Sequence, residues 1–187
     1  MQDISRDVVE RASEGDIEAF EEIYRISASY VYTIAYRVTH SKEDAEEVTQ
    51  DVFMGVYRNI GKFQSRSTFK TWVYRITMNI AINLINRRKR KTGRTITYDD
   101  AISAGENIYA HEGQLYKEDD KKVIESMLRV LPPEQKACIV LKVMEGLKYK
   151  EIAEILKINI NTVRSRLKRA RERLLALRKR EASGDEV

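Results

Sequence analysis

The sequence predicts an all-α protein, and three features indicate that class. Only 8 glycines occur in 187 residues, and the only 2 prolines, Pro132 and Pro133, are adjacent, so residues that interrupt helices are scarce. The chain is rich in Glu, Lys, Arg, Leu and Ile, a composition that favours helix. The alternation of apolar and polar residues that marks a half-buried strand is hard to find. A chain of this length forms one medium domain or two small ones.

The first two predicted helices are Ile4–Ala12 and Asp16–His40, and Gly15 separates them. Apolar residues in the longer segment recur along a broad stripe at helical spacing, which is typical of a helix with one buried face. The stripe comprises Phe20, Ile23, Tyr24, Ile26, Tyr30, Val31, Ile34, Ala35 and Val38.

A third helix is predicted to begin after Ser41. A serine oxygen can accept a hydrogen bond from the first turn of a helix, and Glu43 and Asp44 suit its positive end. The helix fades near Asn59–Gly61. Its apolar positions are Ala45, Val48, Val52, Phe53, Val56 and Tyr57.

The loop GKFQSRS leads to a fourth predicted helix, which begins at Ser67 or Thr68 and ends near Lys91. The apolar positions of this helix are expected to pack the first domain. They are Phe69, Trp72, Val73, Ile76, Ile80, Leu84 and Ile85.

The composition changes after the fourth helix and divides the chain into two domains. Between Thr92 and Lys122, glycine, serine, acids and isolated aromatic residues occur without a sustained period, which is typical of a linker. We therefore expect a first domain over residues 1–93, a flexible linker over 94–122, a second domain over 123–180 and a tail over 181–187.

The second domain is predicted to begin with a helix over Val123–Leu131, which stops at the two prolines. Proline is well placed to open the next helix, Glu134–Glu145, and Gly146 is expected to end it. The residues of this helix expected to point inward are Cys138, Leu141 and Met144.

The segments that follow have the spacing of a helix-turn-helix, in which the second helix enters the DNA major groove. The two helices are predicted over Tyr149–Leu156 and about Ile160–Arg180, with Asn159 as the N-cap of the second. The inward residues are Ile152, Ala153 and Leu156 in the first helix and Val163, Leu167, Ala170 and Leu174 in the second.

The outer face of the second helix is strongly basic. Arg164–Arg180 contains nine basic residues and one acid, Glu172. A solvated helix usually mixes the two signs at i and i+4, whereas a polyanion relieves repulsion among cations. The pattern favours DNA binding, and a solvated helix in a bundle or at the end of a coiled coil is the alternative. The outward residues are Thr162, Arg164, Ser165, Lys168, Arg169 and Arg171.

Charge is distributed in blocks, although the formal net charge is only +5. Basic residues concentrate in Arg87–Arg94 and in the helix-turn-helix, and acids concentrate in Glu43–Asp51 and Asp99–Asp120. Two basic blocks divided by an acidic stretch indicate two contact surfaces for a polyanion.

Other sequence features exclude several classes of protein. A single cysteine, Cys138, excludes an internal disulfide and fits a reducing compartment. His40 and His111 lie far apart in the sequence, so neither a metal cluster nor a cofactor is expected. The N-terminal segment lacks the regions of a signal peptide, and no apolar run approaches the roughly 20 residues of a membrane helix. We therefore expect a cytoplasmic protein with no membrane insertion.

Two stretches of the chain resemble one known family. DAEEVTQDVF, STFKTWVYRI and the pattern N-x-A-x-N running into RRKR resemble region two of bacterial sigma factors. LPPEQKACIVLKVMEGLKYKEIAEILKININTVRSRLKRARERL resembles region four of the extracytoplasmic-function group. The matches cover about Asp16–Arg94 and Val123–Leu177. The resemblance implies a protein that is not an enzyme, but that binds core RNA polymerase, directs it to promoters and helps to open the DNA.

The resemblance assigns polymerase binding to the acidic third helix, which would meet the clamp helices of the largest polymerase subunit. An acidic helix suits a basic coiled coil, although a solvated acidic face would show the same local pattern. The flap of the second-largest subunit is a further expected contact. The expected clamp-binding residues are Asp44, Glu47, Gln50 and Asp51.

The resemblance assigns the minus-ten promoter element to the fourth helix and the loop before it. Melting requires aromatic surface for stacking, amides for base edges and cations for phosphates. Phe69 and Trp72 are interpreted as core residues rather than stacking platforms. The loop lacks the glycine often found there in the family. The candidate residues are Phe63, Gln64, Ser65, Arg66, Arg75, Asn79, Asn83, Arg87 and Arg88.

The minus-thirty-five element is assigned in the same way to the helix-turn-helix. Lys148 stands where a serine commonly caps the first helix of the motif, and a lysine cannot accept a hydrogen bond from a backbone amide. The cap must therefore come from another residue. The candidate DNA contacts are Thr162, Arg164, Ser165, Lys168, Arg169, Lys148 and Tyr149.

Two other functions are possible at this point. A two-domain helix-turn-helix regulator would bind duplex DNA without polymerase, but it would not need an acidic helix beside a helix rich in Asn and Arg. A nuclease would need carboxylates in metal-binding geometry, and the acids of Glu43–Asp51 have no basic catalytic partner. Core RNA polymerase, promoter DNA and an anti-sigma factor are the expected partners.

Overall fold

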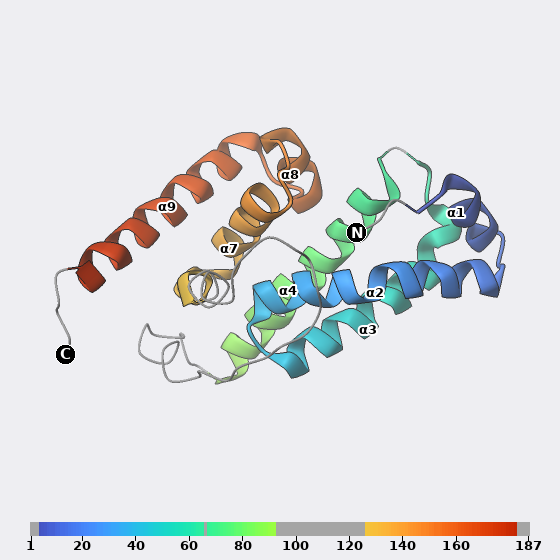
Figure 1. The fold of residues 1–187 in the computed structure, drawn as a ribbon, viewed down its shortest axis with the longest axis horizontal. Helices are drawn as coiled ribbons and strands as arrows, with labels where there is room; N and C mark the ends of the chain where they lie inside the picture. Colours follow the sequence, from blue (N-terminus) through green and yellow to red (C-terminus); the bar gives the residue numbers. More distant parts are fainter. Residues whose placement is uncertain (1–3, 66, 93–125, 183–187) are drawn as a thin grey trace. The chain divides into compact units, whose positions relative to one another are not determined.

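The computed structural model describes residues 4–65, 67–92 and 126–182, and these ranges contain helices and no strand (Figure 1). The all-α prediction is confirmed. The chain divides into two compact units, residues 1–85 with 155–157 and residues 86–154 with 158–187, which are described one at a time. The predicted linker, residues 123–125 and residues 183–187 of the predicted tail lie outside the described residues.

The helices of the first unit begin and end close to their predicted positions. The elements are α1 (Arg6–Ser13), α2 (Ile17–Thr39), α3 (Lys42–Asn59), the 3₁₀ turn η1 (Ile60–Lys62) and α4 (Phe69–Thr92). Gly15 adopts φ +98° between α1 and α2, a conformation that glycine takes without a steric cost.

Side-chain caps explain where these helices start. The Asp16 carboxylate accepts a hydrogen bond from the Ala19 amide at 3.1 Å, and Ser41 Oγ accepts one from the Asp44 amide at 3.1 Å. Each cap satisfies an amide that the helix itself cannot pair. The amide of Ala19 and the guanidinium of Arg11 also hold the pKa of Asp16 below its usual value. The predicted cap at Ser41 is confirmed.

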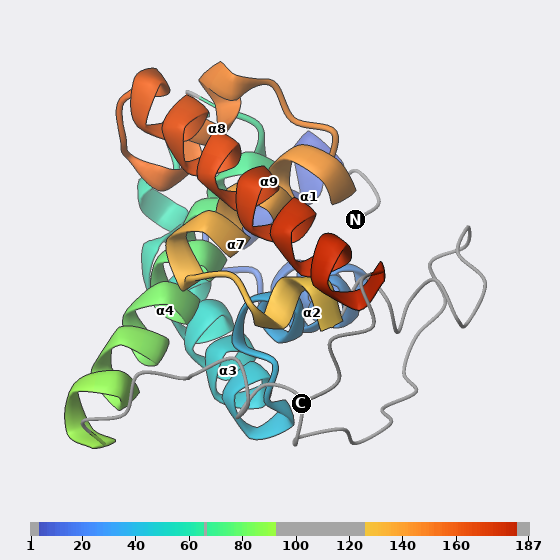
Figure 2. The ribbon, with the colours of Figure 1, turned by 90° about the vertical axis from the view of Figure 1, so that its left-hand side faces the viewer.

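The core of the first unit lies between α2 and α3, which run side by side, while α1 packs against α2 and η1 (Figure 2). The buried residues of α2 and α3 are Ala19, Ile23, Ser27, Val31, Ile34, Ala35, Tyr36 and Val38, and Asp44, Ala45, Val48, Val52, Phe53 and Val56. Helix α4 joins this core at two points. The hydroxyl of Tyr74 is hydrogen-bonded to that of Tyr30, and a Cβ at Gly55 would lie 3.7 Å from Ile76 Cγ2.

The buried face of α4 differs from the predicted one. Ile76 and Ile80 are only half-buried, whereas Thr77 and Met78 are fully buried. The Thr77 hydroxyl donates to the Val73 carbonyl at 2.9 Å, so this polar side chain is satisfied inside the helix and can lie in the core. The buried residues of α4 are Phe69, Val73, Tyr74, Thr77, Met78, Ala81, Leu84 and Ile85.

The second unit contains a helical turn at residues 126–129, α7 (Pro133–Ile139), the π-helix η2 (Val140–Met144), α9 (Ile160–Ala182) and all but the last two residues of α8 (Tyr149–Leu156). The predicted single helix over Glu134–Glu145 is therefore α-helical at first and π-helical in its last turn. Gly146 ends it with φ +68°, as expected. Helices α7 and α9 pack against each other. Every helix in the described ranges is too short or too polar to cross a lipid bilayer.

Candidate nucleic-acid interface

The turn between α8 and α9 is formed by a left-handed residue and a side-chain cap. Lys157 has φ 51°, which reverses the chain after α8. Asn159 Oδ1 accepts a hydrogen bond from the Asn161 amide at 2.8 Å, and the Asn159 carbonyl accepts one from Val163 at 3.1 Å. The predicted cap at Asn159 is confirmed. The two helices and this three-residue turn form the predicted helix-turn-helix.

The buried stripe of α9 is close to the predicted one. Val163, Leu167 and Ala170 are at most 1% exposed, as expected. Leu174 is only half-buried, however, and Leu177 is buried in the last turns. In α8, Ala153 is half-buried while Ile155 is fully buried.

The opposite face of α9 is a row of exposed cations with hydroxyls between them. Arg164 Nη1 donates to Asn161 Oδ1 at 3.1 Å, which holds the guanidinium near the start of the helix. Lys168 lies 3.9 Å from Glu172, but both side chains are more than half exposed, so the pair is weak. Exposed guanidinium and ammonium groups on one helix face can reach base edges and phosphates. Of the candidates on α9, Arg164, Ser165, Lys168 and Arg169 are exposed and Thr162 is half-buried.

Lys148 and Tyr149 lie at the start of α8. The Lys148 amide donates to Glu151 Oε2 at 2.6 Å. In a capping box, this bond from the backbone amide to a glutamate three residues later is paired with a second bond made by a serine side chain. The contact with Glu151 pairs the amide of the residue that directly precedes α8. The Lys148 side chain is exposed, and Tyr149 is half-buried.

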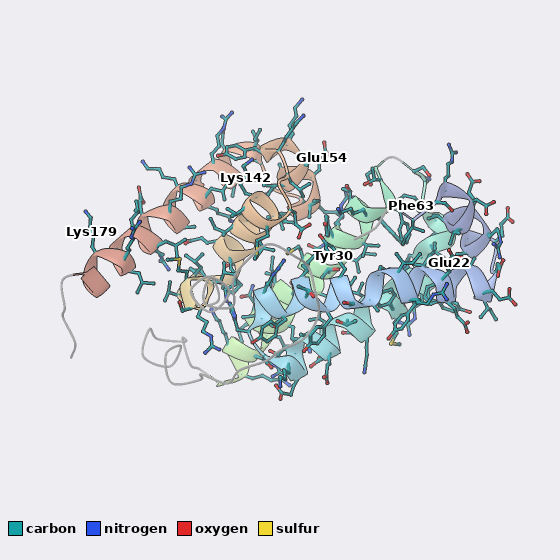
Figure 3. The ribbon with its side chains drawn as sticks, in the orientation of Figure 1. Glu22, Tyr30, Phe63, Lys142, Glu154 and Lys179 are labelled. Carbon is teal, nitrogen blue, oxygen red and sulfur yellow. The ribbon has the colours of Figure 1, made fainter. Side chains whose placement is uncertain are left out.

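An aromatic cluster anchors the loop before α4. Phe63, labelled in Figure 3, lies 5.6 Å from Phe69 and 5.2 Å from Trp72 between ring centroids. Phe69 is buried and Trp72 half-buried, in agreement with their interpretation as packing residues. Phe63 is also half-buried, so it is part of this cluster and not a free stacking platform.

The rest of this loop is exposed. Gln64 and Ser65 are exposed, whereas Arg66 lies outside the described residues. Ser65 has φ 52°, the left-handed conformation that favours glycine. Ser65 therefore adopts, without being glycine, a backbone conformation that glycine takes at no steric cost.

One face of α4 combines amides and cations. Arg75 and Asn79 are half-buried one turn apart, and Asn83 is exposed on the next turn. Arg87 and Arg88 are exposed one turn farther along. The structure thus places five of the predicted minus-ten candidates along successive turns of one helix, with the two amides between Arg75 and the pair Arg87 and Arg88.

The acidic helix α3 shows only part of its charge to solvent. Gln50 and Asp51 are exposed and Glu47 is half-buried, but Asp44 is only 6% exposed. Glu46 is exposed beside these residues although the sequence did not single it out. Burial together with Glu46 and Glu43 raises the pKa of Tyr32, as expected near a concentration of negative charge.

An exposed apolar patch continues the acidic face toward the end of α3. It consists of Tyr24, Met54 and Tyr57, which are 51%, 50% and 61% exposed. Edge-to-face ring pairs support it, with Tyr24 against Phe53 at 4.7 Å and Tyr57 against Phe20 at 5.1 Å. Exposed contiguous apolar side chains are typical of protein-binding surfaces.

Comparison with known proteins shows the family to which the chain belongs. Residues 23–91 match the family Sigma-70 region 2, and residues 121–174 match Sigma-70, region 4. The RNA polymerase sigma-H factor of Pseudomonas aeruginosa is 31% identical over 91% of this chain and 92% of its own length. The ECF RNA polymerase sigma factor SigW of Bacillus subtilis is 31% identical over 89% of this chain and 92% of its length. The chain spans 60% of the ECF sigma factor SigE of Mycolicibacterium smegmatis, with 36% identity over 83% of this chain.

Two solved structures share the fold. The sigma factor RpoE in complex with the anti-sigma factor NepR, from Bartonella quintana, has a TM-score of 0.65 and 24% identity, and covers 91% of this chain and 100% of its own. CnrH in complex with the cytosolic domain of CnrY has a TM-score of 0.65 and 21% identity, and covers 97% of this chain and 98% of its own.

The two helical units, one with a helix-turn-helix and a cationic second helix, define a DNA-binding transcription factor. The chain belongs to the sigma factors of bacterial RNA polymerase, in the extracytoplasmic-function group. It is an initiation factor that directs RNA polymerase to promoters, and not an enzyme.

Sequence reasoning missed the apolar patch because it assigned Tyr24 and Tyr57 to buried stripes. Met54 carried a usable signal, since it lies three and four residues after Asp51 and Gln50 and therefore on the outer face of α3. The burial of Asp44 also had a signal, because Asp44 lies next to Ala45 and four residues before Val48, both of which are on the inner face of α3.

Proposed function

We propose that this sigma factor acts through three surfaces. Helix α9 reads the minus-thirty-five element, α4 and the loop before it hold the melted minus-ten element, and α3 with the apolar patch binds core polymerase. The observation that carries the proposal is the outer face of α9, where Arg164, Lys168 and Arg169 are exposed opposite the buried residues Val163, Leu167 and Ala170.

In the upstream contact, Arg164 is the base-reading residue. It lies in the first turns of α9, the part of a recognition helix that reaches base edges, and its guanidinium can fork onto guanine. Thr162 and Ser165 flank it on the same turns. Lys168 and Arg169 lie farther along and meet phosphates, as do Lys148 and Tyr149 at the start of α8.

In the downstream contact, Asn79 and Asn83 hold the edges of unstacked bases. Asparagine is a poor helix former, and its amide both donates and accepts hydrogen bonds, as base edges require. The loop residues Gln64, Ser65 and Arg66 close over a flipped nucleobase. The Phe63 cluster holds the start of that loop in place. Arg75, Arg87 and Arg88 attract the single-stranded backbone.

Polymerase binding combines charge and apolar contact on α3. Glu46, Glu47, Gln50 and Asp51 face the basic clamp helices of the largest subunit, and the apolar patch supplies the buried centre of that interface. Asp44 is omitted from this surface because its carboxylate is buried. The second unit contacts the flap of the second-largest subunit.

Regulation by an anti-sigma factor is part of the proposal. Two structures with the same fold are complexes, one of the sigma factor RpoE with the anti-sigma factor NepR and one of CnrH with the cytosolic domain of CnrY. We extend the idea to this chain: an anti-sigma factor covers its DNA- and polymerase-binding surfaces until a signal releases it. Binding of this chain to polymerase, to promoter DNA and to the anti-sigma factor takes place in the cytoplasm, where polymerase transcribes.

The melting role can be separated from duplex reading by a template that is already open. We expect Asn79→Ala with Asn83→Ala to reduce initiation by reconstituted holoenzyme on duplex promoter DNA and to recover on the same promoter with an unpaired minus-ten bubble. Asn59→Ala, an exposed asparagine on α3, is the matched control and should initiate normally on both. Equal defects on duplex and bubble templates would show that these residues do not act in opening the DNA.

A further inference from the structure

Residues 145–148 form the connector between η2 and α8. A lysine that has no proposed role in reading DNA holds this connector in place. Lys142, labelled in Figure 3, lies in the π-helical turn before the helix-turn-helix. Its Nζ donates a hydrogen bond to the Leu147 carbonyl at 3.2 Å and lies 5.6 Å from the centroid of the Tyr149 ring. Both contacts are made within the second unit, across five and seven residues.

Those contacts complete the hydrogen bonding of the connector. The Leu147 amide donates to the Leu141 carbonyl at 3.1 Å, and Lys142 takes the Leu147 carbonyl. The Lys148 amide donates to Glu151 at 2.6 Å, and the Lys148 carbonyl accepts from Ile152 at 3.0 Å. The backbone on both sides of the Leu147–Lys148 peptide is therefore fixed, with Lys142 holding the carbonyl at its centre.

The ammonium group has the chemistry for this task. It has three N–H donors, so one can bond a carbonyl while the charge faces an aromatic ring. A lysine whose charge is engaged by a carbonyl and a ring is less available to a phosphate than the exposed side chains of Lys148 and Lys150. The π turn itself, closed by the Glu145 amide on the Val140 carbonyl at 3.2 Å, is a rare helix form that occurs frequently at functional sites.

We propose that Lys142 is a positioning residue for promoter recognition. By tying Leu147 to Tyr149 it fixes where α8 begins, and so it sets how the helix-turn-helix sits on the groove and how α9 meets the base edges. The inference rests on the proposed reading of the upstream element by the second unit. Lys142 itself makes no DNA contact in this scheme.

The test measures DNA affinity and its salt dependence with the full chain. The probe is a duplex carrying the upstream element of a promoter mapped from holoenzyme transcripts, compared with a scrambled duplex. We expect Lys142→Met to weaken binding to the element about tenfold, a typical coupling for residues that act together. Binding to the scrambled duplex and the slope of log K against log salt should not change. Lys142→Arg, which keeps the donor and the charge over the ring, should restore binding.

Lys150→Met is the matched control, since it removes one charge from an exposed position on α8 without touching the connector. Lys142→Met could instead lower the slope of log K against log salt by about 0.9 and weaken binding to both duplexes equally. That result would make Lys142 a phosphate contact and overturn the proposal. So would full affinity in the Met variant. If that variant does not fold, Lys142→Gln, whose neutral amide is on a shorter side chain than the lysine ammonium, must show the same selective loss. Failure of the wild-type chain to prefer the element would instead refute upstream reading itself.

Discussion

Replacing Arg164 by alanine tests whether the row of cations on α9 includes a residue that reads bases. Arg164 is exposed in the second turn of the helix, and its hydrogen bond to Asn161 at 3.1 Å holds the guanidinium in place before DNA arrives. A bidentate arginine–guanine contact is worth about 1–3 kcal/mol of discrimination. The dissociation constant for the preferred duplex should therefore rise by about 5- to 150-fold.

The assay is fluorescence anisotropy on a set of duplexes that differ at single positions of the upstream element. Arg164→Ala should lose the preference at one position and keep it at the others. Arg173→Ala, which removes an exposed arginine farther along α9, should weaken binding to every duplex alike or leave it unchanged. Equal losses on every duplex for Arg164→Ala would refute the assignment of Arg164 to base reading.

Three other outcomes are expected. Lys157→Gly should raise the free energy of unfolding by about 0.5–1 kcal/mol, because φ 51° is strained for lysine but not for glycine. Lys157→Ala is the control, since it removes the same charge without relieving the backbone strain. Equal melting curves for the two variants would contradict this prediction. Tyr57→Ser should weaken binding to core polymerase about tenfold or more while leaving duplex binding unchanged, as titrations with each partner would show. Burial raises the pKa of the Cys138 thiol to about 11, so a thiol reagent at neutral pH should label Cys138 only on unfolding, and rapid labelling of the native protein would be inconsistent with that burial.

Helix positions could be predicted from the sequence where a cap marks the start. Ser41 and Asn159 each precede a helix at the predicted place, because their side-chain oxygens pair amides in the first turn. The periodicity of α2 and α9 was also informative, since each has a buried apolar stripe and a polar face.

Helix α4 shows why periodicity alone can select the wrong face. It has buried residues over a wide arc, so its apolar stripe is poorly defined, and a buried threonine stands where a hydrophobic residue would be expected. Thr77 fits because its hydroxyl is bonded to the Val73 carbonyl, a solution that a residue-type pattern does not reveal. Ile76 was counted as core but packs at the edge, next to Gly55.

Backbone details of the candidate sites were beyond sequence patterns. Ser65 and Lys157 both adopt left-handed conformations without being glycine, and the π turn before Gly146 has no residue signature. The resemblance and the acidic character of the helix placed Asp44 among the clamp-binding residues, yet neither says which side of a helix a carboxylate occupies. The contacts of Lys142 depend on that π turn and likewise appear only in three dimensions.

Transcription by reconstituted holoenzyme tests the central claim most directly. Core RNA polymerase with this chain should be supplied with fragmented genomic DNA, and the 5′ ends of the transcripts sequenced. The start sites should share two upstream elements and should disappear when Arg164→Ala is combined with Asn79→Ala and Asn83→Ala. Start sites that are the same with and without the chain, while it still binds duplex DNA, would contradict the claim that its two units together direct polymerase to promoters.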